Sequence, residues 1–515
     1  MTMGERVCLL TDLLPKITEV AMPITSSIQD SRSRMYAALH RDINPDMHVR
    51  HFCVFGRDAS LYYAEGLCSV AFLQHYVLTP LTSLRDAHIP ADLAETLRQA
   101  VYAADVQAAA TVKESVAQTL TGRAVVFVDG MNCALGFDVR MFVRRGISTP
   151  QTEQVVLGPH EGFNESLRDC ITLIRRILPT PDLIGELRQI GSRYPVGMCV
   201  MYLHGIADEA LLCRVKARLD GIRADHVLSI GALQQLMEDR PYALLPQCIL
   251  TERPDRAASM LLEGQIVLLL DGSSQALVLP ASIWHLLHTP DDTSARFQYG
   301  TFMRLIRLLG LLCALLLPGL CVAFVSFHPE ALPVTLLTSI LESQASVPFS
   351  FPVETAVMLI MFNLIGEAAT RVPSVVGSTL GTVSGLILGS AAVDAHPGHP
   401  LLRIVVAVAS LGSYAVPDYS LGIALRIGQL LMVLAGSIFG VYGMVLMVAV
   451  GAVRLCSLTS LGSPFAAPYS PPRAHNPDGI TRAPLWMQRG RTWLSAADDR
   501  LRVDGPMRRW DRRNR

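Results

Sequence analysis

The C-terminal half of the chain contains four long runs without a charged residue. They are Leu308–Phe327, Val372–Val393, Ile404–Pro417 and Ile427–Val453, with 20, 22, 14 and 27 residues. A helix needs about 20 apolar residues to cross the hydrocarbon of a bilayer, so three runs are long enough as they stand. The third is long enough only if it continues past Asp418. The pattern predicts an α-helical membrane domain over 304–456 with about four crossings, at 308–327, 372–393, 404–425 and 427–453.

A shorter apolar patch lies ahead of the second long run. Thr355–Gly366 has 12 residues between Glu354 and Glu367. Apolar stretches of about 10–14 residues are typical of buried, re-entrant or interfacial helices. We therefore predict a re-entrant or interfacial piece here, not a crossing.

Charged residues near the ends of the runs predict the orientation of the membrane domain. Basic residues gather on the cytoplasmic side of membrane proteins. Arginines flank the first and last runs, whereas the connection 328–370 carries glutamates and no lysine or arginine. We expect the soluble region and both termini to be cytoplasmic, with 457–515 as a basic cytoplasmic tail. The flanking arginines are Arg296, Arg304, Arg307 and Arg454, and the glutamates are Glu330, Glu342, Glu354 and Glu367.

Small residues follow a regular spacing inside the second run. Glycine recurs at every fourth position, and hydroxyl residues form a neighbouring row at the same spacing. Residues four apart share one helix face, and a face of small residues lets another helix approach closely. The partner helix is either a copy of the same helix, in a ring around a narrow wet path, or another helix of the same subunit. The glycines are Gly377, Gly381, Gly385 and Gly389, and the hydroxyl residues are Ser374, Ser378 and Thr382.

A break interrupts the apolar pattern between the last two runs. The break begins within the stretch "VPDYS", and Asp418 and Arg426 are the charged residues at its two ends. Proline removes a backbone donor, and ionisable groups at membrane depth usually face a protein interior or a wet cavity. The alternative is a short exterior turn in which Asp418 is solvated.

The composition excludes several classes of protein. Charged residues make up 17% of the chain, against roughly 25% in soluble proteins. A net charge of zero gives no support to a nucleic-acid partner. Eleven cysteines without a C-x-x-C pair argue against a zinc or redox centre, so we expect neither metal nor cofactor.

The soluble half contains an internal duplication. His51–Ser69 resembles Arg188–Asp208, and Gly122–Phe137 resembles Gly264–Leu279, in the same order and at similar spacing. An Asp-Gly pair between β-rich runs predicts a hairpin in each copy, and strands alternate with helical patterns. We predict two related α/β subdomains, at 46–146 and 150–295, after an N-terminal extension of residues 1–45.

The soluble half carries no P-loop, no G-x-S-x-G and no H-E-x-x-H, so we do not expect an enzyme. Gly158–Leu178 opens a helix, where the glycine could help to bind an anion or simply form a turn. "TERPDR", at Thr251–Arg256, is either an ion-pair cluster at an interface or a solvated loop.

Seven motifs follow one another along the chain: "GPHEGFNESL", "LIRRIL", "TERPDR", "LLEGQIVLLLDG", "FHPEALP", "EAATRVPSVVG" and "VPDYSLG". In this order they resemble the signatures of GerA-family spore germination proteins. The chain resembles this family from about Val155 to Trp486, with a weaker similarity before it. The family pattern differs at His160, Gly366 and Asp418.

The resemblance implies a multi-pass protein of the inner spore membrane. A subunits of this family are expected to form a homo-oligomeric ring and to work with a transporter-like B subunit and a lipoprotein C subunit. Nutrient would then open an ion path. With this function in view, we take Glu367, Arg371, Asp394 and Asp418 as candidate charged residues at the mouths of the path. The alternatives are an amplifier of germination similar to stage V sporulation protein AF, and a stand-alone transporter.

Overall fold

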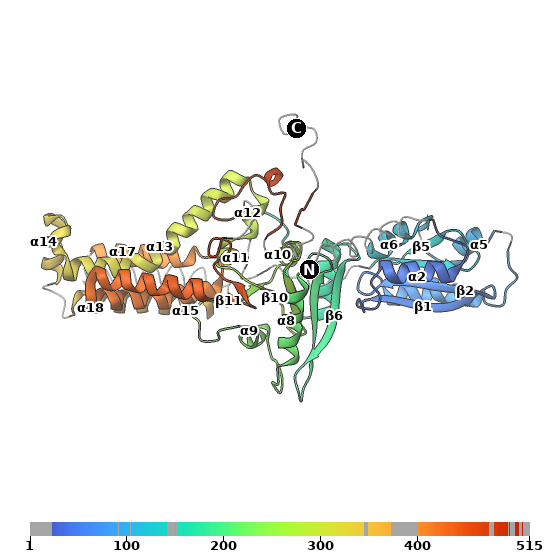
Figure 1. The fold of residues 1–515 in the computed structure, drawn as a ribbon, viewed down its shortest axis with the longest axis horizontal. Coiled ribbons are helices and arrows are strands. Elements are labelled where there is room, and N and C mark those ends of the chain that lie inside the picture. The colour runs from blue at the N-terminus through green and yellow to red at the C-terminus, as the bar shows by residue number, and fades with distance from the viewer. Residues whose placement is uncertain are drawn as a thin grey trace, which may run out of the picture.

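The computed structural model describes residues 23–503 and residue 507, apart from gaps at 91, 104, 142–149, 151–152, 154, 156, 345–348, 372–399, 473–477, 493 and 495–499. The molecule is elongated, as Figure 1 shows. A helix bundle lies at one end, one α/β subdomain at the other, and a second α/β subdomain between them. This arrangement confirms the predicted fold class.

The first subdomain is a five-stranded antiparallel sheet covered by helices on both faces. The strand order is β1-β2-β4-β5-β3. Helices α2 and α6 cover one face, and η1, α4 and α5 cover the other, whereas α3 has no buried residue. The strands are β1 (Met47–Val54), β2 (Arg57–Ala64), β3 (Val106–Ala109), β4 (Arg123–Val128) and β5 (Ala134–Asp138). The helices are α2 (Ile28–Ala38), α3 (Val70–Phe72), η1 (Leu73–Leu78), α4 (Thr79–Ser83), α5 (Leu93–Ala100) and α6 (Val112–Leu120).

The second subdomain repeats this topology, with the strand order β6-β7-β9-β10-β8. Helices α7 and α10 cover one face of its sheet, and α8 and α9 cover the other. The strands are β6 (Leu183–Ile190), β7 (Val196–Leu203), β8 (Ile249–Thr251), β9 (Ile266–Leu270) and β10 (Ala276–Leu279). The helices are α7 (Leu167–Ile177), α8 (Glu209–Asp220), α9 (Ile230–Met237) and α10 (Pro254–Leu261).

The two Asp-Gly pairs form the predicted hairpin turns and have the same second role in each copy. Asp129 Oδ1 accepts a hydrogen bond from the first backbone N–H of α2, at Ile28, over 3.1 Å. Asp271 Oδ1 accepts the corresponding bond from Leu167, the first residue of α7, over 3.2 Å. A carboxylate at a helix start satisfies an N–H that has no partner within the helix. Each turn therefore fixes the helix that precedes its sheet.

This contact moves the boundary of the first subdomain. Helix α2 lies within the predicted extension 1–45, yet its Met35 is fully buried against the first sheet. The first subdomain therefore begins before residue 46, because α2 is the counterpart of α7 in the repeat.

The predicted tail also belongs partly to the core. Phe465 is fully buried in the second subdomain, and Leu458 and Leu461 pack beside it in its two core clusters. Two short strands, β11 (Thr459–Ser460) and β12 (Ser463–Pro464), lie between Leu458 and Phe465. The helix η3 (Leu485–Met487) comes later in the chain. Residues 458–465 thus do not form a solvated tail, because their apolar side chains complete the second subdomain.

The bundle is formed by α13, α15, α17 and α18, with α14 at its far end (Figure 1). Among the described residues, three helices are long and apolar enough to cross a membrane: Phe297–Phe327, Phe351–Ala368 and Tyr419–Ser457. The patch 355–366 therefore lies inside a helix of crossing length, not in a short re-entrant piece. The elements are α13 (Phe297–Phe327), η2 (Pro329–Ala331), α14 (Val334–Gln344), α15 (Phe351–Arg371), α17 (Pro400–Tyr414) and α18 (Tyr419–Ser457).

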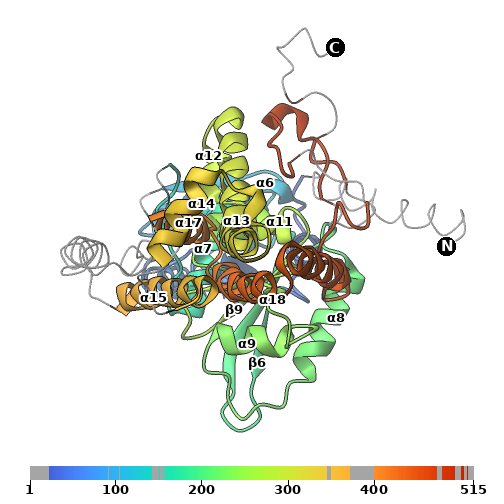
Figure 2. The same cartoon turned by 90° about the vertical axis from the view of Figure 1, so that its left-hand side faces the viewer.

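Helix α18 is a hairpin of two helical segments. Gly440 has φ 61° and ψ −143°, far from helical values. A Cβ on Gly443 would overlap the carbonyl oxygen of Ala435, eight residues earlier, which a straight helix would hold about 12 Å away. Both Leu421 and Leu458 pack in the core of the second subdomain, and Figure 2 shows the two segments side by side. The chain therefore runs out to Gly440 and returns.

The predicted crossings 404–425 and 427–453 are wrong in their boundaries. The break falls at residues 415–418, between α17 and α18, and Arg426 lies inside α18. Pro417 cannot donate a backbone hydrogen bond, and Asp418 caps the new helix through Leu421 N at 2.8 Å. The break between α17 and α18 therefore falls at Asp418, which can cap the new helix, and not at Arg426, the next charged residue.

Close approaches between helices of the bundle occur at glycines. A Cβ on Gly412 of α17 would overlap the carbonyl oxygen of Gly310 of α13. A Cβ on Gly436 of α18 would lie 2.7 Å from the carbonyl oxygen of Gly319 of α13. Glycine pairs of this kind let membrane helices pack at short distance. In the described part of the bundle, they join helices of the same chain.

Candidate functional site at the base of the helix bundle

The structure separates the predicted site residues. Gly377, Gly381, Gly385, Gly389, Ser378, Thr382 and Asp394 lie outside the described residues, so their roles stay predictions. Glu367 is exposed near the end of α15, and Arg371 is the last residue of that helix. Asp418 begins α18.

Asp418 lies on the side of the bundle that faces the soluble region. Its neighbours Val416 and Leu421 pack in one core cluster with Ala257 and Phe465 of that region. The interpretation of an exterior turn is therefore wrong, because α15 runs the length of the bundle once more than the predicted crossings do. Burial raises the pKa of Asp418, while the nearby Arg256 opposes this shift.

Asp292 is the centre of a buried ion-pair cluster at this base. It lies in α12 (Pro290–Ser294) and is fully buried. Arg307 of α13 donates to both carboxylate oxygens, from Nη1 to Oδ2 at 2.7 Å and from Nη2 to Oδ1 at 2.8 Å. Arg304 Nε donates to Oδ2 at 3.2 Å. Residues three apart on a helix are neighbours, so both guanidinium groups reach one carboxylate.

The backbone orients the same carboxylate. Thr289 N–H donates to Asp292 Oδ2 at 3.2 Å, which forms a capping box at the start of α12. Burial alone would raise the pKa of Asp292, but the hydrogen bonds and charges of Arg307 and Arg304 outweigh it and hold the pKa below its usual value. The group is therefore a carboxylate that carries its charge inside the protein.

The C-terminal segment closes the cluster from the other side. Asp478 Oδ1 accepts from Arg304 Nη1 at 2.6 Å. Arg482 donates to the backbone carbonyls of Asp292, Thr293 and Ala295, the last two at 2.9 Å. The cluster thus joins α12, the first bundle helix and a segment more than 170 residues further along the chain.

A second buried group lies beside the first. Arg253 is fully buried and donates to Asp255 Oδ2 and to the Pro159 carbonyl, both at 2.8 Å. Arg256 donates to Glu153 Oε1 and to the His285 carbonyl, the latter at 3.0 Å. The "TERPDR" motif is therefore an ion-pair cluster, and the interpretation of a solvated loop is wrong.

Gly158 does not form a helix start. Helix α7 begins at Leu167 and is capped by Ser166 and Asp271. Gly158 has φ 124° and lies near Arg253, in the segment that this arginine holds through Pro159. The turn interpretation of this glycine agrees with the structure.

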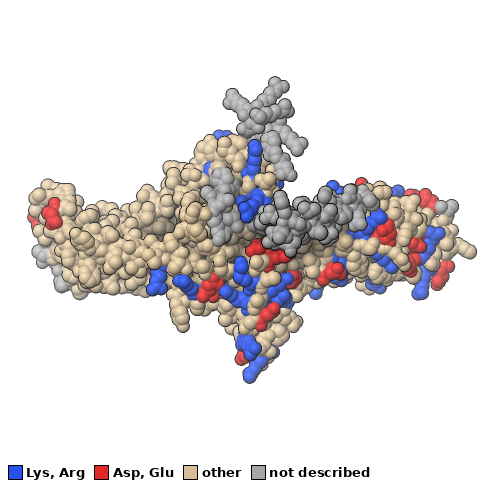
Figure 3. All heavy atoms as spheres, in the orientation of Figure 1, with Lys and Arg blue, Asp and Glu red and all other residues tan. Residues whose placement is uncertain are grey.

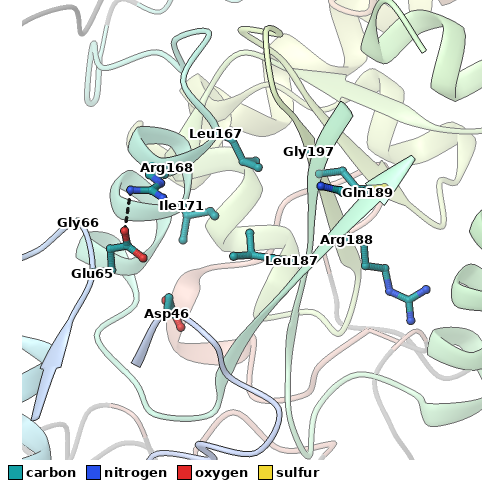
Figure 4. Close-up of a pocket in the computed structure, with 11 residues that line it drawn as sticks. Asp46, Glu65, Gly66, Leu167, Arg168, Ile171, Leu187, Arg188, Gln189 and Gly197 are labelled. Atoms are coloured by element: carbon teal, nitrogen blue, oxygen red, sulfur yellow. Dashed lines mark ion pairs between the residues drawn. The ribbon is translucent and has the colours of Figure 1, made fainter. Parts of the chain in front are cut away.

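A cavity of about 550 Å³ lies where the two soluble subdomains meet (Figure 4). An ion pair of 2.7 Å between Arg168 of α7 and Glu65 lies on one side of it. Asp46, another residue that lines the cavity, contacts the buried Arg175 of α7 through Oδ2 at 2.6 Å. Because these contacts join the two subdomains, they fix one copy of the repeat on the other.

The comparison with known families decides what kind of protein carries this base. The sequence model of the Bacillus/Clostridium GerA spore germination protein matches residues 34–493, which include both soluble subdomains, the bundle and most of the C-terminal segment. The chain belongs to the GerA family of spore germination proteins. The resemblance found in the seven motifs is thereby confirmed.

Relatives of this GerA protein match along most of their length. Spore germination protein B1 of Bacillus subtilis (strain 168) is 33% identical over 485 residues, which is 93% of this chain and 100% of that protein. Spore germination protein KA of the same organism is 32% identical over 86% of this chain and 82% of its own. A crystal structure of the N-terminal domain of the A subunit of the Bacillus megaterium spore germinant receptor GerK3 is 25% identical, with a TM-score of 0.40, and covers 50% of this chain and 96% of that one.

The residues at the base of this GerA protein were only partly visible in its sequence. In the sequence, Arg304 and Arg307 indicate only the orientation of the membrane domain, and Asp292, Asp478 and Arg482 have no predicted role. A usable signal was present, since Thr289 with Asp292 fits the capping-box spacing and two arginines three apart precede an apolar helix. Nothing local indicated that Asp478 would reach Arg304.

Two half-buried histidines should make this base sensitive to acid. Burial, reinforced by neighbouring positive charges, lowers the pKa of His285 and of His288 to about 3. His285 Nδ1 accepts a hydrogen bond from Ser282 N–H at 3.3 Å, which protonation of that nitrogen would abolish. An unfolded chain has the ordinary histidine pKa of about 6.5, so it takes up protons between pH 6.5 and 3 that the folded chain does not.

We therefore expect full stability above pH 6.5 and a loss of about 2 kcal/mol for each histidine at pH 5. Thermal unfolding of the detergent-solubilised chain at pH 7 and pH 5 measures this loss. His288→Gln retains a donor for the Gly479 carbonyl, which His288 Nε2 contacts at 3.0 Å, and should remove about half of the loss. If His288→Gln lost as much stability between pH 7 and pH 5 as the parent chain, His288 would not be a source of the acid sensitivity.

Proposed function

We propose that this GerA protein is a non-enzymatic membrane subunit of a spore germinant receptor, and that it opens an ion path in response to nutrient. The observation that carries the proposal is the family match over residues 34–493, which spans the soluble repeats and the bundle together. Relatives that cover nearly the whole chain are named spore germination proteins. By this proposal, the inner spore membrane holds the bundle, and the soluble region lies on the cytoplasmic side.

The geometry of the base supports a coupling role within this function. The Asp292 cluster joins the soluble region to α13, and Leu421 and Leu458 join both ends of α18 to the second subdomain core. A displacement of the second subdomain would therefore be transmitted to the helices as a rigid movement. Bistable or rigid contacts of this kind are how distant sites are coupled.

The path itself is proposed to involve the segment 372–393. Near the end of α15, Gly366 contacts Tyr414 at the base, whereas Leu402 of α17 packs with Phe351 and Val322 at the far end. The described chain thus leaves at one end of the bundle and resumes at the other, which supports a crossing in between. We propose that the glycine face of this segment packs against copies of itself in a homo-oligomer and that Glu367, Arg371, Asp394 and Asp418 lie near the mouths. Partners would be a transporter-like B subunit and a lipoprotein C subunit.

A genetic test separates a receptor subunit from an amplifier. Spores lacking the other GerA-family genes should regain release of core cations, with single nutrients offered in turn, when this chain is restored together with its B and C subunits. An amplifier would not restore the response without another receptor. Failure of every nutrient in the restored spores would contradict the proposal.

A separate test concerns the assembly. Cysteines placed at Gly381 and Gly385 should form cross-links between chains if the segment packs on its own copies. Cross-links confined to single chains would favour packing within one subunit and would remove the ring.

A further inference from the structure

The loop of residues 239–246, between α9 and β8, is held against the end of α18. Arg240 Nη1 donates to the hydroxyl of Ser457, the last residue of α18, at 3.1 Å. Thr459 Oγ1 and Gly462 N donate to Asp239 Oδ2 at 2.6 and 3.1 Å. The position of this loop along the axis of the bundle is therefore fixed at the end of α18.

The loop is also rigid in itself. Gln247 is buried, with 1% of its surface exposed. Its side chain accepts from Arg240 N at 3.0 Å and donates to the Arg240 carbonyl at 2.7 Å. Arg218 of α8 contacts Asp239 Oδ1 at 2.6 Å and thus holds the start of the loop to the second subdomain.

Side chains of the loop alternate between two environments. Ala243 and Leu245 pack against the core cluster that also contains Leu421 and Leu458 at the bundle base. Tyr242 and Leu244 point away, with exposures of 100% and 52%. A rigidly held loop therefore presents one aromatic and one aliphatic side chain outward beside the membrane helices.

The level of these two side chains matches the interfacial layer of a bilayer. Val453 of α18 is 69% exposed and apolar, and it lies about 6 Å along the helix from Ser457. Each interfacial layer is about 5–8 Å thick, since a bilayer of about 40–45 Å has a hydrocarbon core of about 30 Å. Figure 3 shows a bundle surface almost without charge, which gives way to charged residues where the soluble subdomain begins. Tyrosine is enriched at this layer because it has an apolar ring and a polar hydroxyl.

We propose that Tyr242 and Leu244 insert into the interfacial layer of the leaflet that faces the soluble region. The partner of this surface is the lipid bilayer, and the contact anchors the second subdomain against the membrane. Arg240 and Arg454, at the same level, favour phospholipid head groups with negative charge. This contact requires that the bundle spans the membrane, but it does not depend on the proposed receptor function.

Photo-cross-linking tests the proposal on the full chain. A benzophenone amino acid replaces Tyr242, and the purified chain is reconstituted into vesicles of phosphatidylglycerol and phosphatidylethanolamine. Tyr102 is the matched control, since it is 77% exposed and follows α5 at the end of the molecule away from the bundle (Figure 1). After irradiation, mass spectrometry should find lipid adducts at position 242 and none at position 102.

Two outcomes would overturn the proposal. The first is the absence of lipid adducts at position 242, and the second is an adduct to another protein chain in their place. Leu244→Asp with the probe at 242 should reduce the lipid adduct several-fold. Its thermal unfolding in detergent should match that of the parent chain because Leu244 is half exposed, so a loss of adduct with unchanged unfolding reports the membrane contact.

Discussion

Asp292→Asn is expected to destabilise the full chain by about 3–5 kcal/mol, because it leaves two buried arginines without their shared negative charge. The asparagine has nearly the same shape, so the loss reports charge and not volume. Arg304 would retain Asp478, whereas Arg307 would retain only the Thr289 hydroxyl and the Leu287 carbonyl. Thermal unfolding in detergent and the amount of chain in the membrane fraction measure the effect.

Asp225→Asn is the matched control for this variant. It makes the same chemical change in the pair between Arg193 and Asp225, whose N···O distance is 4.0 Å and whose side chains are 76% and 71% exposed. Exposed pairs contribute about 0–1 kcal/mol, so little change is expected. If Asp292→Asn and Asp225→Asn had the same unfolding temperature and the same amount of chain in the membrane fraction, the Asp292 cluster would not stabilise the base.

Gly440→Ala is expected to destabilise the α18 hairpin. The dihedral angles of Gly440 lie where side chains are strained by about 1–3 kcal/mol. A Cβ there would also lie 3.0–3.3 Å from three carbons of Phe327, at the end of α13. Because this turn joins the outgoing and the returning segment of α18, we expect lower accumulation in the membrane and a lower unfolding temperature.

Gly451→Ala serves as the control in the same element. Gly451 is helical, and a Cβ on it would meet no other atom within 4 Å. Alanine is favoured over glycine in a helix by about 1 kcal/mol, so this change should be neutral or slightly stabilising. A Gly440→Ala chain as stable as the Gly451→Ala chain would mean that the turn does not require glycine.

Both of the main predictions concern how the soluble region is joined to the membrane. Asp292 holds the entry of α13, and Gly440 sets the return of α18 to the same base. If nutrient binding moves the soluble region, these are the contacts through which the movement reaches the bundle. By the proposed function, variants that fold but uncouple the two regions should therefore fail to release core cations.

The sequence alone determined the features that arise from local patterns. Long charge-free runs predicted a membrane domain, since about 20 apolar residues are the length that a helix needs to cross the hydrocarbon of a bilayer. Similar segments around two Asp-Gly pairs predicted the duplication, because both copies repeat the same strand and turn residues. Seven ordered motifs indicated the family.

Only the tertiary structure decided which distant residues meet. Asp292, Arg304 and Asp478 are brought together from three separate segments. Phe465, which the sequence places in the predicted tail, packs in the core of the second subdomain. The Gly440 reversal was also hidden, since a glycine within an apolar run is common and its dihedral angles depend on what packs around it. Burial makes these contacts energetically large, and burial is a property of the assembled fold, not of any local stretch of sequence.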